Sequence, residues 1–436
     1  MKKPIFISIF SILINALVLN AQEFSLISKA EVLDIVSKNN TSIKISEAEF
    51  NQAKADYAQT NAVFLPNITA SYTALSTTNP LMAFGSKLNQ AILTQADFNP
   101  TLLNNPNQVK NFGTKLEIQQ PLLNLDGIYQ RKAAKSKMEA MHFKTERTQD
   151  YLAFEVDNAY MQLQLAYKTV VVLEKALEAA NATKKLADNS FKQGYLQRAD
   201  VLNVEVRVTE VKNQLQTAKS NVQNASNYLS FLMNDTSYTT YKPSDSLTIL
   251  KTNLENKNIS KNRPDIKAME FATNAYEAMN KADKMAFLPR LNAFGSYELY
   301  DNEIFQADAN GYLIGAQLSW DIFQGSKRFG KTQKSKSELE KSKLEYEQYI
   351  NQTTLELNKA KRVFLDAENK LELTRLALEQ SEESLRIRTN RFKEGLEKTS
   401  DLLQAETQFA QKQLEYYQTV FEYNYAQAYL QFLTKE

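Results

Sequence analysis

Phe191-Lys192-Gln193-Gly194 is the stretch that decides the fold, because it returns as Phe392-Lys393-Glu394-Gly395, displaced by 201 residues. The residues that follow each copy also match: Asp200, Leu202 and Glu205 after the first, and Asp401, Leu403 and Glu406 after the second. Long segments without another Gly or Pro flank both copies. Each Gly is therefore expected to end one long helix in the left-handed conformation before the next helix begins. The two stretches are predicted to be the tips of two helical hairpins.

A second set of residues recurs 223 positions later in the chain and relates its two halves. Leu65-Pro66 closes a helical stretch that begins at Ser28, and Leu288-Pro289 closes its counterpart, which begins at Asn262. Two repeats of one structural unit are therefore predicted, residues 22–258 and 259–436.

After each Leu-Pro pair the hydrophobic period changes from helical to two. Residues 66–123 and 289–323 each hold two alternating stretches, so each is predicted to form a strand hairpin. These stretches are about 10 residues long, as in an outer-membrane barrel, although a half-buried soluble sheet shows the same alternation. The first hairpin carries a long loop, residues 79–111, and the longer loops of such barrels face the cell exterior.

Residues 128–193 and 331–394 contain neither Gly nor Pro, and each range is predicted to form one long helix. At about 1.5 Å per residue each helix would reach about 100 Å, roughly three times a ~30 Å bilayer core. Residues 196–233 and 396–433 are expected to return antiparallel to them. Heptad spacing predicts coiled-coil contacts along the hairpins. In the first long helix the seam contains Leu152, Val156, Ala159, Leu163, Ala166, Val170, Leu173, Leu177 and Ala180.

The N-terminus has the pattern of a secretory signal peptide, residues 1–21. Lys2 and Lys3 precede an apolar run that ends at Leu19, and Ala21 offers a small residue for cleavage. Cleavage lowers Lys+Arg from 52 to 50, against 50 Asp+Glu, so the remaining chain is formally neutral and nucleic acid is not an expected partner.

Composition also limits the chemistry of the chain. Cysteine is absent and His142 is the single histidine, so neither disulfides nor a zinc site of the usual ligands is expected. The sequence contains no Ser/His/Asp or Cys/His constellation. We therefore expect no enzyme activity and no cofactor.

Four strands cannot close a barrel, because single-chain barrels begin at about 8 strands. Open sheet edges in lipid would leave backbone groups unpaired, so the chain is expected to assemble with copies of itself. Two copies would give a narrow barrel filled by side chains. Three copies would give 12 strands with room for a solute.

These features resemble the outer membrane efflux protein family, the TolC-like trimeric channels. The resemblance rests on the two-unit arrangement, the Leu-Pro pairs, the Gly-x5-Asp-x-Leu tips, and the segments 80–88 and 120–123. It implies a mainly α fold with a membrane β-barrel portion. Long antiparallel hairpins would form an α-barrel tunnel, and each protomer would give four strands to a 12-stranded trimeric β-barrel.

The same resemblance implies a function. The chain would be a passive exit duct of a tripartite efflux or type I secretion system, in the outer membrane and extending into the periplasm. Its partners would be two further copies of itself, a periplasmic adaptor (membrane fusion) protein, an inner-membrane RND or ABC transporter, and outer membrane lipid.

In that family, acidic residues near the tips constrict the periplasmic entrance. Asp401 matches such a position and Asp200 is its repeat counterpart, so threefold symmetry would place up to six carboxylates around the opening. Their mutual repulsion would favour cations and raise their pKa values. The alternative is helix capping, for which Asp401 with Gln404 fits better than Asp200 with Asn203. Gln404 and Glu397 depart from the pattern of some relatives, which have an aspartate and an arginine there.

The turns themselves are where relatives meet the adaptor, although the two glycines could simply end helices. The candidate contact residues are Lys192, Gly194, Leu196, Lys393, Gly395, Leu396 and Thr399.

Two other interpretations of the sequence compete with this one. Residues 325–332 match the G-x4-G-K-[ST] pattern of a nucleotide-binding P-loop. A P-loop needs a buried parallel strand and cytoplasmic nucleotide, whereas residues 312–321 alternate and the chain carries an export signal. The matching Asp126-Gly127 indicates a glycine turn between strand and helix, and Lys327, Arg328 and Lys331 fit the periplasm-facing interface of the membrane that the strands would span. An exported trimeric coiled-coil stalk or adhesin is the second alternative, but two returning hairpins argue against it.

Overall fold

A computed structural model describes residues 24–237, 239–250 and 258–435. The predicted signal peptide, residues 1–21, and part of the junction between the repeats lie outside these residues. The chain divides into two compact units. The first is formed by the described residues within 1–41, 150–257 and 359–433, and the second by those within 42–149, 258–358 and 434–436. Each unit takes segments from both predicted repeats.

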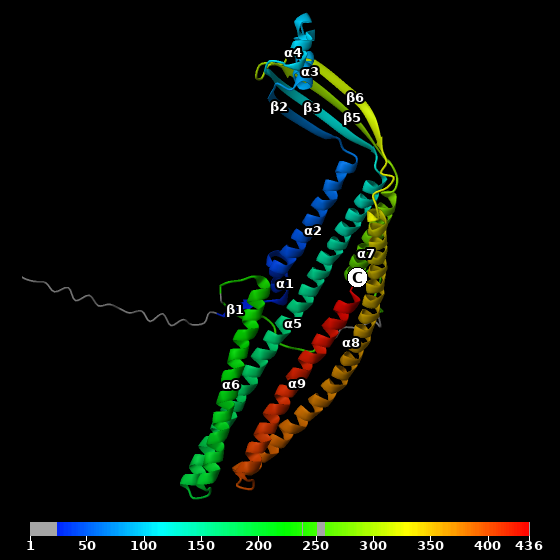
Figure 1. Cartoon of the computed structure of the whole chain (residues 1–436). Coiled ribbons are helices and arrows are strands. Elements are labelled where there is room, and N and C mark those ends of the chain that lie inside the picture. Colours follow the sequence, from blue (N-terminus) through cyan, green and yellow to red (C-terminus); the bar gives the residue numbers. More distant parts are fainter. Residues whose placement is uncertain (1–23, 238, 251–257, 436) are drawn as a thin grey trace, which may run out of the picture. The chain divides into compact units, whose positions relative to one another are not determined.

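The predicted strand pairs, long helices and return helices are present, together with shorter elements (Figure 1). In chain order they are β1 (Phe24–Ile27), α1 (Lys29–Asn39), α2 (Thr41–Gln59), η1 (Thr60–Val63), β2 (Asn67–Thr77), α3 (Pro80–Asn89), η2 (Gln95–Phe98), α4 (Pro100–Asn104), β3 (Val109–Leu123), α5 (Leu125–Lys192), α6 (Arg198–Met233), β4 (Thr240–Pro243), α7 (Pro264–Met285), β5 (Arg290–Asp301), β6 (Ala309–Ser319), α8 (Lys327–Lys393) and α9 (Thr399–Thr434).

The long helices confirm the predicted fold class. α5 has 68 residues and α8 has 67, and each contributes to both units. α6 and α9, with 36 residues each, return from them. None of the helices in the described part of the chain is long and apolar enough to cross a membrane.

In the first unit, the first part of the predicted apolar seam of α5 is buried, whereas Ala166, Val170 and Leu177 are half-buried. Leu152, Val156, Ala159 and Leu163 are between 0% and 6% exposed. Further along α5, Leu173 packs with Leu215 of α6 and with Leu414 of α9. α9 also lies against α5 through aromatic rings, because the ring of Phe154 is within 5.5 Å of those of Tyr425, Tyr429 and Phe432. α5 therefore contacts both its own return helix and the return helix of the other hairpin.

In the second unit, the four predicted strands form one antiparallel sheet in the order β2-β3-β5-β6. Ile68 is paired with Ile118, and Leu116 with Tyr297, so apolar residues of neighbouring strands lie on the same face. The pairing of β3 with β5 is irregular between Pro121 and Leu123, because Pro has no N–H to donate. Among the described residues, β2 and β6 are the two edges of this sheet.

The predicted helix from Ser28 to Phe64 is interrupted in the structure. Ser28 caps α1 in a capping box with Glu31, as a helix start requires. The helix then ends at Asn40, whose ψ of 130° is extended. The Asn40 side chain donates to the Leu232 carbonyl oxygen at 2.7 Å. This contact spans 192 residues of sequence, so local periodicity could not reveal it.

The connection between β2 and β3 contains helices that the sequence analysis did not predict. Pro80 and Pro100 begin α3 and α4, and Asn79 and Asn99 cap them. Lys87 of α3 and Asp97 of η2 form an ion pair at 2.6 Å. Gln90, 3% exposed, donates to the carbonyl oxygens of β3 and β5, so the connection is fixed onto the sheet.

The passage from strand to helix differs between the repeats. Asn124 alone separates β3 from α5, whereas residues 320–326 separate β6 from α8. Gly325, with a φ of +63°, turns the second connection. The predicted glycine turn at Asp126-Gly127 is wrong, because both residues lie in the first turn of α5.

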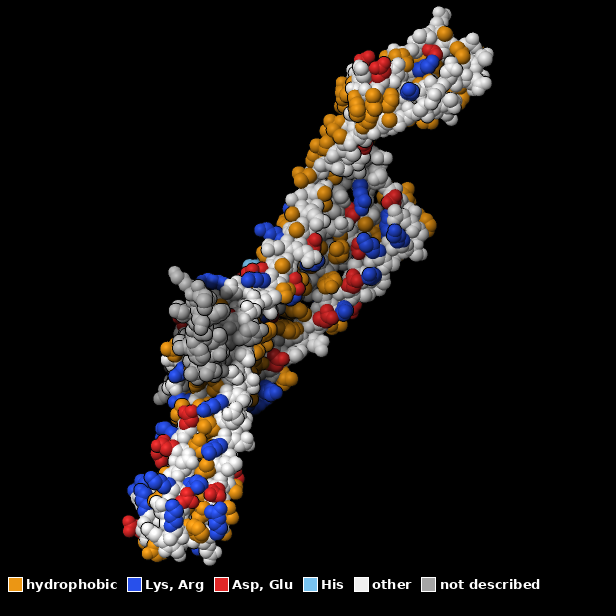
Figure 2. Space-filling model, turned by 90° about the vertical axis from the view of Figure 1, so that its left-hand side faces the viewer, with side chains coloured by type: hydrophobic (Ala, Val, Ile, Leu, Met, Phe, Trp, Pro, Cys, Tyr) orange, Lys and Arg blue, Asp and Glu red, His pale blue; other side chains and the backbone are white. Residues whose placement is uncertain are grey.

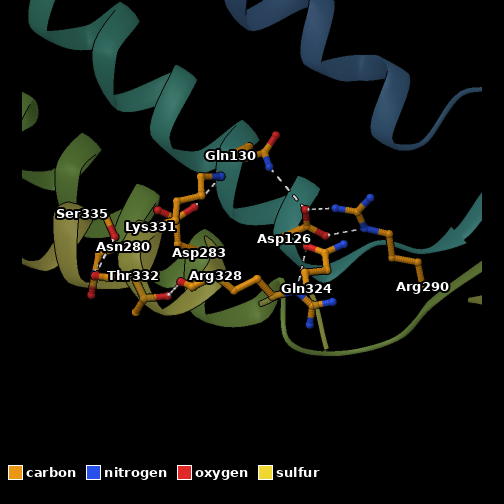
Figure 3. A network of polar contacts seen from close by, with 10 residues as sticks. All are labelled: Asp126, Gln130, Asn280, Asp283, Arg290, Gln324, Arg328, Lys331, Thr332 and Ser335. Carbon is orange, nitrogen blue, oxygen red and sulfur yellow. Dashed lines mark hydrogen bonds and ion pairs between the residues drawn. The ribbon is translucent and has the colours of Figure 1, made fainter. Parts of the chain in front are cut away.

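Two buried carboxylates lie at these helix ends, each held by a cation (Figure 3). Asp126 accepts two hydrogen bonds from Arg290, at 3.1 and 2.5 Å. Asp283 of α7 lies 2.8 Å from Lys331 Nζ. Asn280, on the same face of α7 as Asp283, donates to Ser335 Oγ at 3.0 Å and so fastens α7 to α8. These contacts fix the helices beneath the strands.

The P-loop-like stretch is part of this network. Lys331 is bound to Asp283, and Arg328 donates to the Asp321 carbonyl oxygen. β6, which precedes the stretch, is an antiparallel edge strand. The stretch therefore has neither the strand nor the uncommitted lysine of a phosphate-binding loop.

Candidate functional site

The two hairpin turns lie at the same end of the first unit (Figure 1). Gly194 has a φ of +79° and Gly395 a φ of +70°, as predicted for left-handed helix terminators. The Tyr195 N–H donates to the Ser190 carbonyl and the Leu396 N–H to the Arg391 carbonyl, both at 2.9 Å. These are the six-to-one bonds of the Schellman motif. The repeated sequence therefore forms a repeated turn.

The predicted adaptor-contact residues differ in their exposure. Lys192, Gly194, Lys393, Gly395 and Leu396 are exposed, and Leu196 is half-buried. Thr399, at the start of α9, is 3% exposed within a single chain and offers no surface to a partner. Tyr195, which the sequence analysis did not single out, is 79% exposed between Gly194 and Leu196. Its only sequence signal is a large aromatic residue next to a turn glycine.

Asp200 lies in the first turn of α6. Its Oδ2 accepts from the Gln197 N–H at 3.1 Å, and the Asp200 N–H donates to the Gln197 carbonyl oxygen. Gln197 is the capping residue, so Asp200 occupies the third helical position. A carboxylate is favourable there, because the N-terminal end of a helix carries partial positive charge. Part of the role of Asp200 is therefore to start the helix.

Asp401 also lies in the first turn of its helix, because α9 begins at Thr399. The proposed cap of Asp401 with Gln404 is therefore wrong, since Asp401 follows the helix start. The Ser400 hydroxyl donates to Asp401 Oδ1 at 3.2 Å, and Arg388 Nη1 lies 3.9 Å from Asp401 Oδ2. The Asp401 side chain is 41% exposed, which leaves it open to solvent at the tip.

Glu397 is the centre of an ion cluster that the sequence analysis did not predict. Its side chain is 11% exposed and accepts from Arg388 Nη1 and from Arg391 Nε, both at 2.8 Å. Arg391 also donates to the Leu396 carbonyl oxygen at 3.2 Å. We call Arg388, Arg391 and Glu397 the tip clamp. It joins α8 to the turn that leads into α9, within one hairpin.

An open groove of about 730 Å³ lies beside the tip clamp on α8. It combines two apolar side chains with charges of both signs, and Figure 2 shows the same mixture of charges at this helical end. The groove is lined by Leu376, Glu379, Gln380, Glu383, Ser384, Ile387, Arg388, Arg391 and Glu397.

The tip of the first hairpin also contains ion pairs, but between other residues. Lys184 of α5 lies 2.9 Å from Asp188 and 3.5 Å from Glu205 of α6, and Arg198 lies 3.8 Å from Glu205. These carboxylates raise the pKa of Lys184, with the hydrogen bond to Asp188 as the largest cause. The two tips thus share a backbone but differ in their ion pairs.

Within the described ranges, no group of three or more His, Cys, Asp or Glu side chains is placed to hold a metal ion. What the tips offer is a set of fixed carboxylates and cations around two exposed turns.

The fold is that of solved bacterial membrane channels. The chain is similar to CusC, whose structures concern transmembrane channel formation, with 15% identity and a TM-score of 0.80 over 93% of this chain and 92% of CusC. The outer-membrane channel OprN gives 17% identity and a TM-score of 0.81 over 93% and 89% of the two chains. The CmeC outer membrane channel of Campylobacter jejuni gives 17% and 0.79 over 93% and 85%. These likenesses define the class of the fold.

The family is identified from the amino-acid sequence. The model of the outer membrane efflux protein family matches residues 32–235 and 257–434, and the chain belongs to that family. Comparison with curated proteins gave no match. Membership confirms the predicted resemblance, and with it the predictions that the protein is a channel component and not an enzyme.

Proposed function

We propose that the protein is the outer membrane channel of a tripartite efflux or type I secretion system, a passive homotrimeric duct across the outer membrane that extends into the periplasm. The observation that carries the proposal is the combination of two helical hairpins, whose exposed turns lie at one end of a unit, with a sheet of four strands that has two open edges. Family membership supports the same function.

The open edges favour assembly. β2 and β6 each present backbone N–H and C=O groups to any neighbouring strand, and an open edge in lipid is costly. Pairing β6 of one copy with β2 of the next would remove every edge in a closed ring. Three copies give 12 strands, enough for a barrel with an aqueous interior.

The exposed turns favour docking. We propose that Lys192, Gly194, Leu196, Lys393, Gly395 and Leu396 contact a periplasmic adaptor protein, which would connect the duct to an inner-membrane RND or ABC transporter. The adjacent groove on α8 offers the same partner both salt-bridging and apolar contacts.

The gate assignment follows from the same arrangement. We propose that Asp200 and Asp401 constrict the entrance, with up to six carboxylates in a trimer. Arg388 lies near Asp401 but is held by Glu397, so much of the acidic character of Asp401 would be retained. We further propose that residues 1–21 are removed on export and that residues 22–258 and 259–436 are the two structural repeats.

Reconstitution into planar bilayers tests the proposal. A channel predicts discrete conductance steps that require the trimer, whereas an exported stalk predicts none. Crosslinking before reconstitution would give the copy number. Absence of discrete steps from correctly folded trimer would refute the proposed function.

A further inference from the structure

One face of the four-stranded sheet carries a group of charged side chains on its two middle strands. Lys115 and Glu117 lie two residues apart on β3, and Glu298 of β5 is the register partner of Lys115. Side chains alternate along a strand and paired residues share a face, so these three lie on the same face. Leu116 and its partner Tyr297 lie on the other face. The edge strands β2 and β6 contain no charged residue over their described lengths.

The three charged side chains form one ionic cluster. Lys115 Nζ lies 2.9 Å from Glu117 Oε2 and 3.5 Å from Glu298 Oε1. Glu117 also accepts a hydrogen bond from Gln119 at 2.7 Å, and Glu298 accepts one from the Tyr300 hydroxyl. The charged side chains are nevertheless 28% to 41% exposed in the single chain. We call Lys115, Glu117 and Glu298 the sheet cluster, whose charges are fixed in place and open to solvent.

The charges of the sheet cluster do not cancel. One ammonium group is shared by two carboxylates, which leaves one excess negative charge per copy. Arg290, the first residue of β5, lies on the same face by alternation. Its charge is already matched, because Asp126 accepts its hydrogen bonds. A ring of three copies would therefore carry three excess negative charges at the level of the sheet cluster.

Two aromatic rings on this face lie against the sheet. Tyr300 is the register partner of Gly113, and a Cβ at Gly113 would be 3.4 Å from the tyrosine ring. Phe294 is the partner of Gly315, where a Cβ would be 2.7 Å from the phenylalanine ring. Each ring thus covers a glycine of the neighbouring strand. The large side chains of this face are kept close to the strands, and Tyr300 is held where its hydroxyl reaches Glu298.

We propose that this face lines the interior of the barrel, and that the sheet cluster favours cationic solutes over anionic ones as they pass. This role rests on the proposed function, because only a closed ring of copies gives the face an interior. It assigns a second electrostatic element to the duct. The sheet cluster belongs to the second unit, whereas Asp200 and Asp401 belong to the first.

The physical basis is the cost of charge in lipid and the strength of fixed charge in a narrow passage. Charged side chains on the lipid face of a barrel are unfavourable, so the apolar face is the one that would meet lipid. Inside a passage with low-dielectric walls, fixed charges of one sign concentrate ions of the other sign. Rings of carboxylates favour cations in this way.

Cysteine accessibility tests which face lines the interior, because the chain has no cysteine of its own. Ser71 is the partner of Lys115 and lies on the charged face, whereas Ala70 is the partner of Leu116 and lies on the apolar one. In lipid bilayers, charged methanethiosulfonate reagents should modify Ser71→Cys and leave Ala70→Cys unmodified. In a protein that conducts, modification of both positions, or of Ala70→Cys alone, would overturn the inference.

The rates at Ser71→Cys then measure the local charge. The ratio of the rate with a cationic reagent to the rate with an anionic one should fall about tenfold when Glu117→Gln and Glu298→Gln are added, the scale of counter-ion concentration in a charged cleft. Lys115→Met should raise the same ratio. Glu303→Gln removes an exposed carboxylate from the connection between β5 and β6 and should leave the ratio unchanged. An equal fall in Glu303→Gln would overturn the inference.

Ion selectivity connects the sheet cluster to transport. The permeability ratio of K⁺ to Cl⁻, from reversal potentials in a KCl gradient, should fall in the double variant Glu117→Gln with Glu298→Gln and rise in Lys115→Met. Opposite shifts cannot come from general damage to the barrel. The same comparison in chains that also carry Asp200→Ala and Asp401→Ala removes the contribution of the tips.

The outcomes separate the two proposals. If the wild-type protein forms no channels, the proposed function fails. If channels form and the permeability ratio is the same in wild type, the double variant and Lys115→Met, the role of the sheet cluster fails alone.

Discussion

Arg388 Nη1 donates to Glu397 Oε1 at 2.8 Å, and the same nitrogen lies 3.9 Å from Asp401 Oδ2. Arg388, the cation beside the candidate gate residue Asp401, thus already donates a hydrogen bond to Glu397 of its own hairpin. A carboxylate at position 397 therefore has a specific effect, because it accepts the hydrogen bonds of Arg388 and Arg391 and so competes with Asp401 for Arg388.

Removing the charge of Glu397 should weaken the negative charge of the gate without a substitution at Asp200 or Asp401. In Glu397→Gln, Arg388 is free to approach Asp401, so block of the channel by divalent cations should weaken by about two- to fivefold, the scale of an exposed ion pair. Glu394→Gln, an exposed carboxylate in the same turn, is the control and should block like wild type. Equal block in Glu397→Gln and wild type would contradict the shielding role.

The carboxylates themselves can be tested together. Asp200→Ala with Asp401→Ala removes up to six charges from the trimer entrance, so divalent-cation block should weaken further than in Glu397→Gln. Block is measured as the loss of conductance on titration with Mg²⁺. Because Asp200 also bonds the Gln197 N–H, each single variant needs a melting curve beside its conductance. Undiminished block would remove the gate assignment.

The ion pair between Arg290 and the buried carboxylate of Asp126 should matter for stability. Arg290→Ala leaves Asp126 with Gln130, at 3.4 Å, as its hydrogen-bond partner, and the cost should be about 1–3 kcal/mol in unfolding free energy. Lys334→Ala is the control, because Lys334 is 76% exposed and its change should be near zero. Trp320, the single tryptophan, reports unfolding in urea by fluorescence. Equal midpoints for the two variants would show that the pair contributes nothing.

The ion pair in the β2–β3 connection predicts an acid transition. The hydrogen bond from Lys87, followed by those from Thr94, lowers the pKa of Asp97 from 3.8 to about 2. A carboxyl group whose pKa is lowered in the folded protein stabilises the fold at pH values above its pKa in the unfolded chain. That stabilisation is lost as the pH falls from about 4 towards 2.

Amide hydrogen exchange in η2 and α3 should therefore quicken over that range in the wild type. In Asp97→Asn it should already be fast at neutral pH. Asp308→Asn, in the other connection between strands, should leave exchange in η2 and α3 unaltered. Slow exchange in Asp97→Asn at neutral pH would show that the ion pair does not hold this connection.

Most of the architecture could be predicted because it depends on local signals. Gly194 and Gly395 mark the turns, and the absence of other glycines and prolines marks the long helices. The helix break at Asn40 could not be predicted, since the Leu232 carbonyl that holds it is distant in sequence. The repeat identified Asp200 and Asp401 as candidates, but not their neighbours. Arg388 reaches Glu397 only because the chain reverses between them, and that geometry exists only in the folded turn.

The two open edges of the sheet have a genetic consequence. If each barrel is closed by three copies, every pore contains three products of the same gene, and one defective chain enters most of the assemblies in a cell that makes both forms. Altered tips, such as Asp401→Ala, should therefore be dominant in mixed expression, because one changed protomer alters the whole entrance. Altered edge strands should be recessive, because a chain that cannot pair is excluded from the ring.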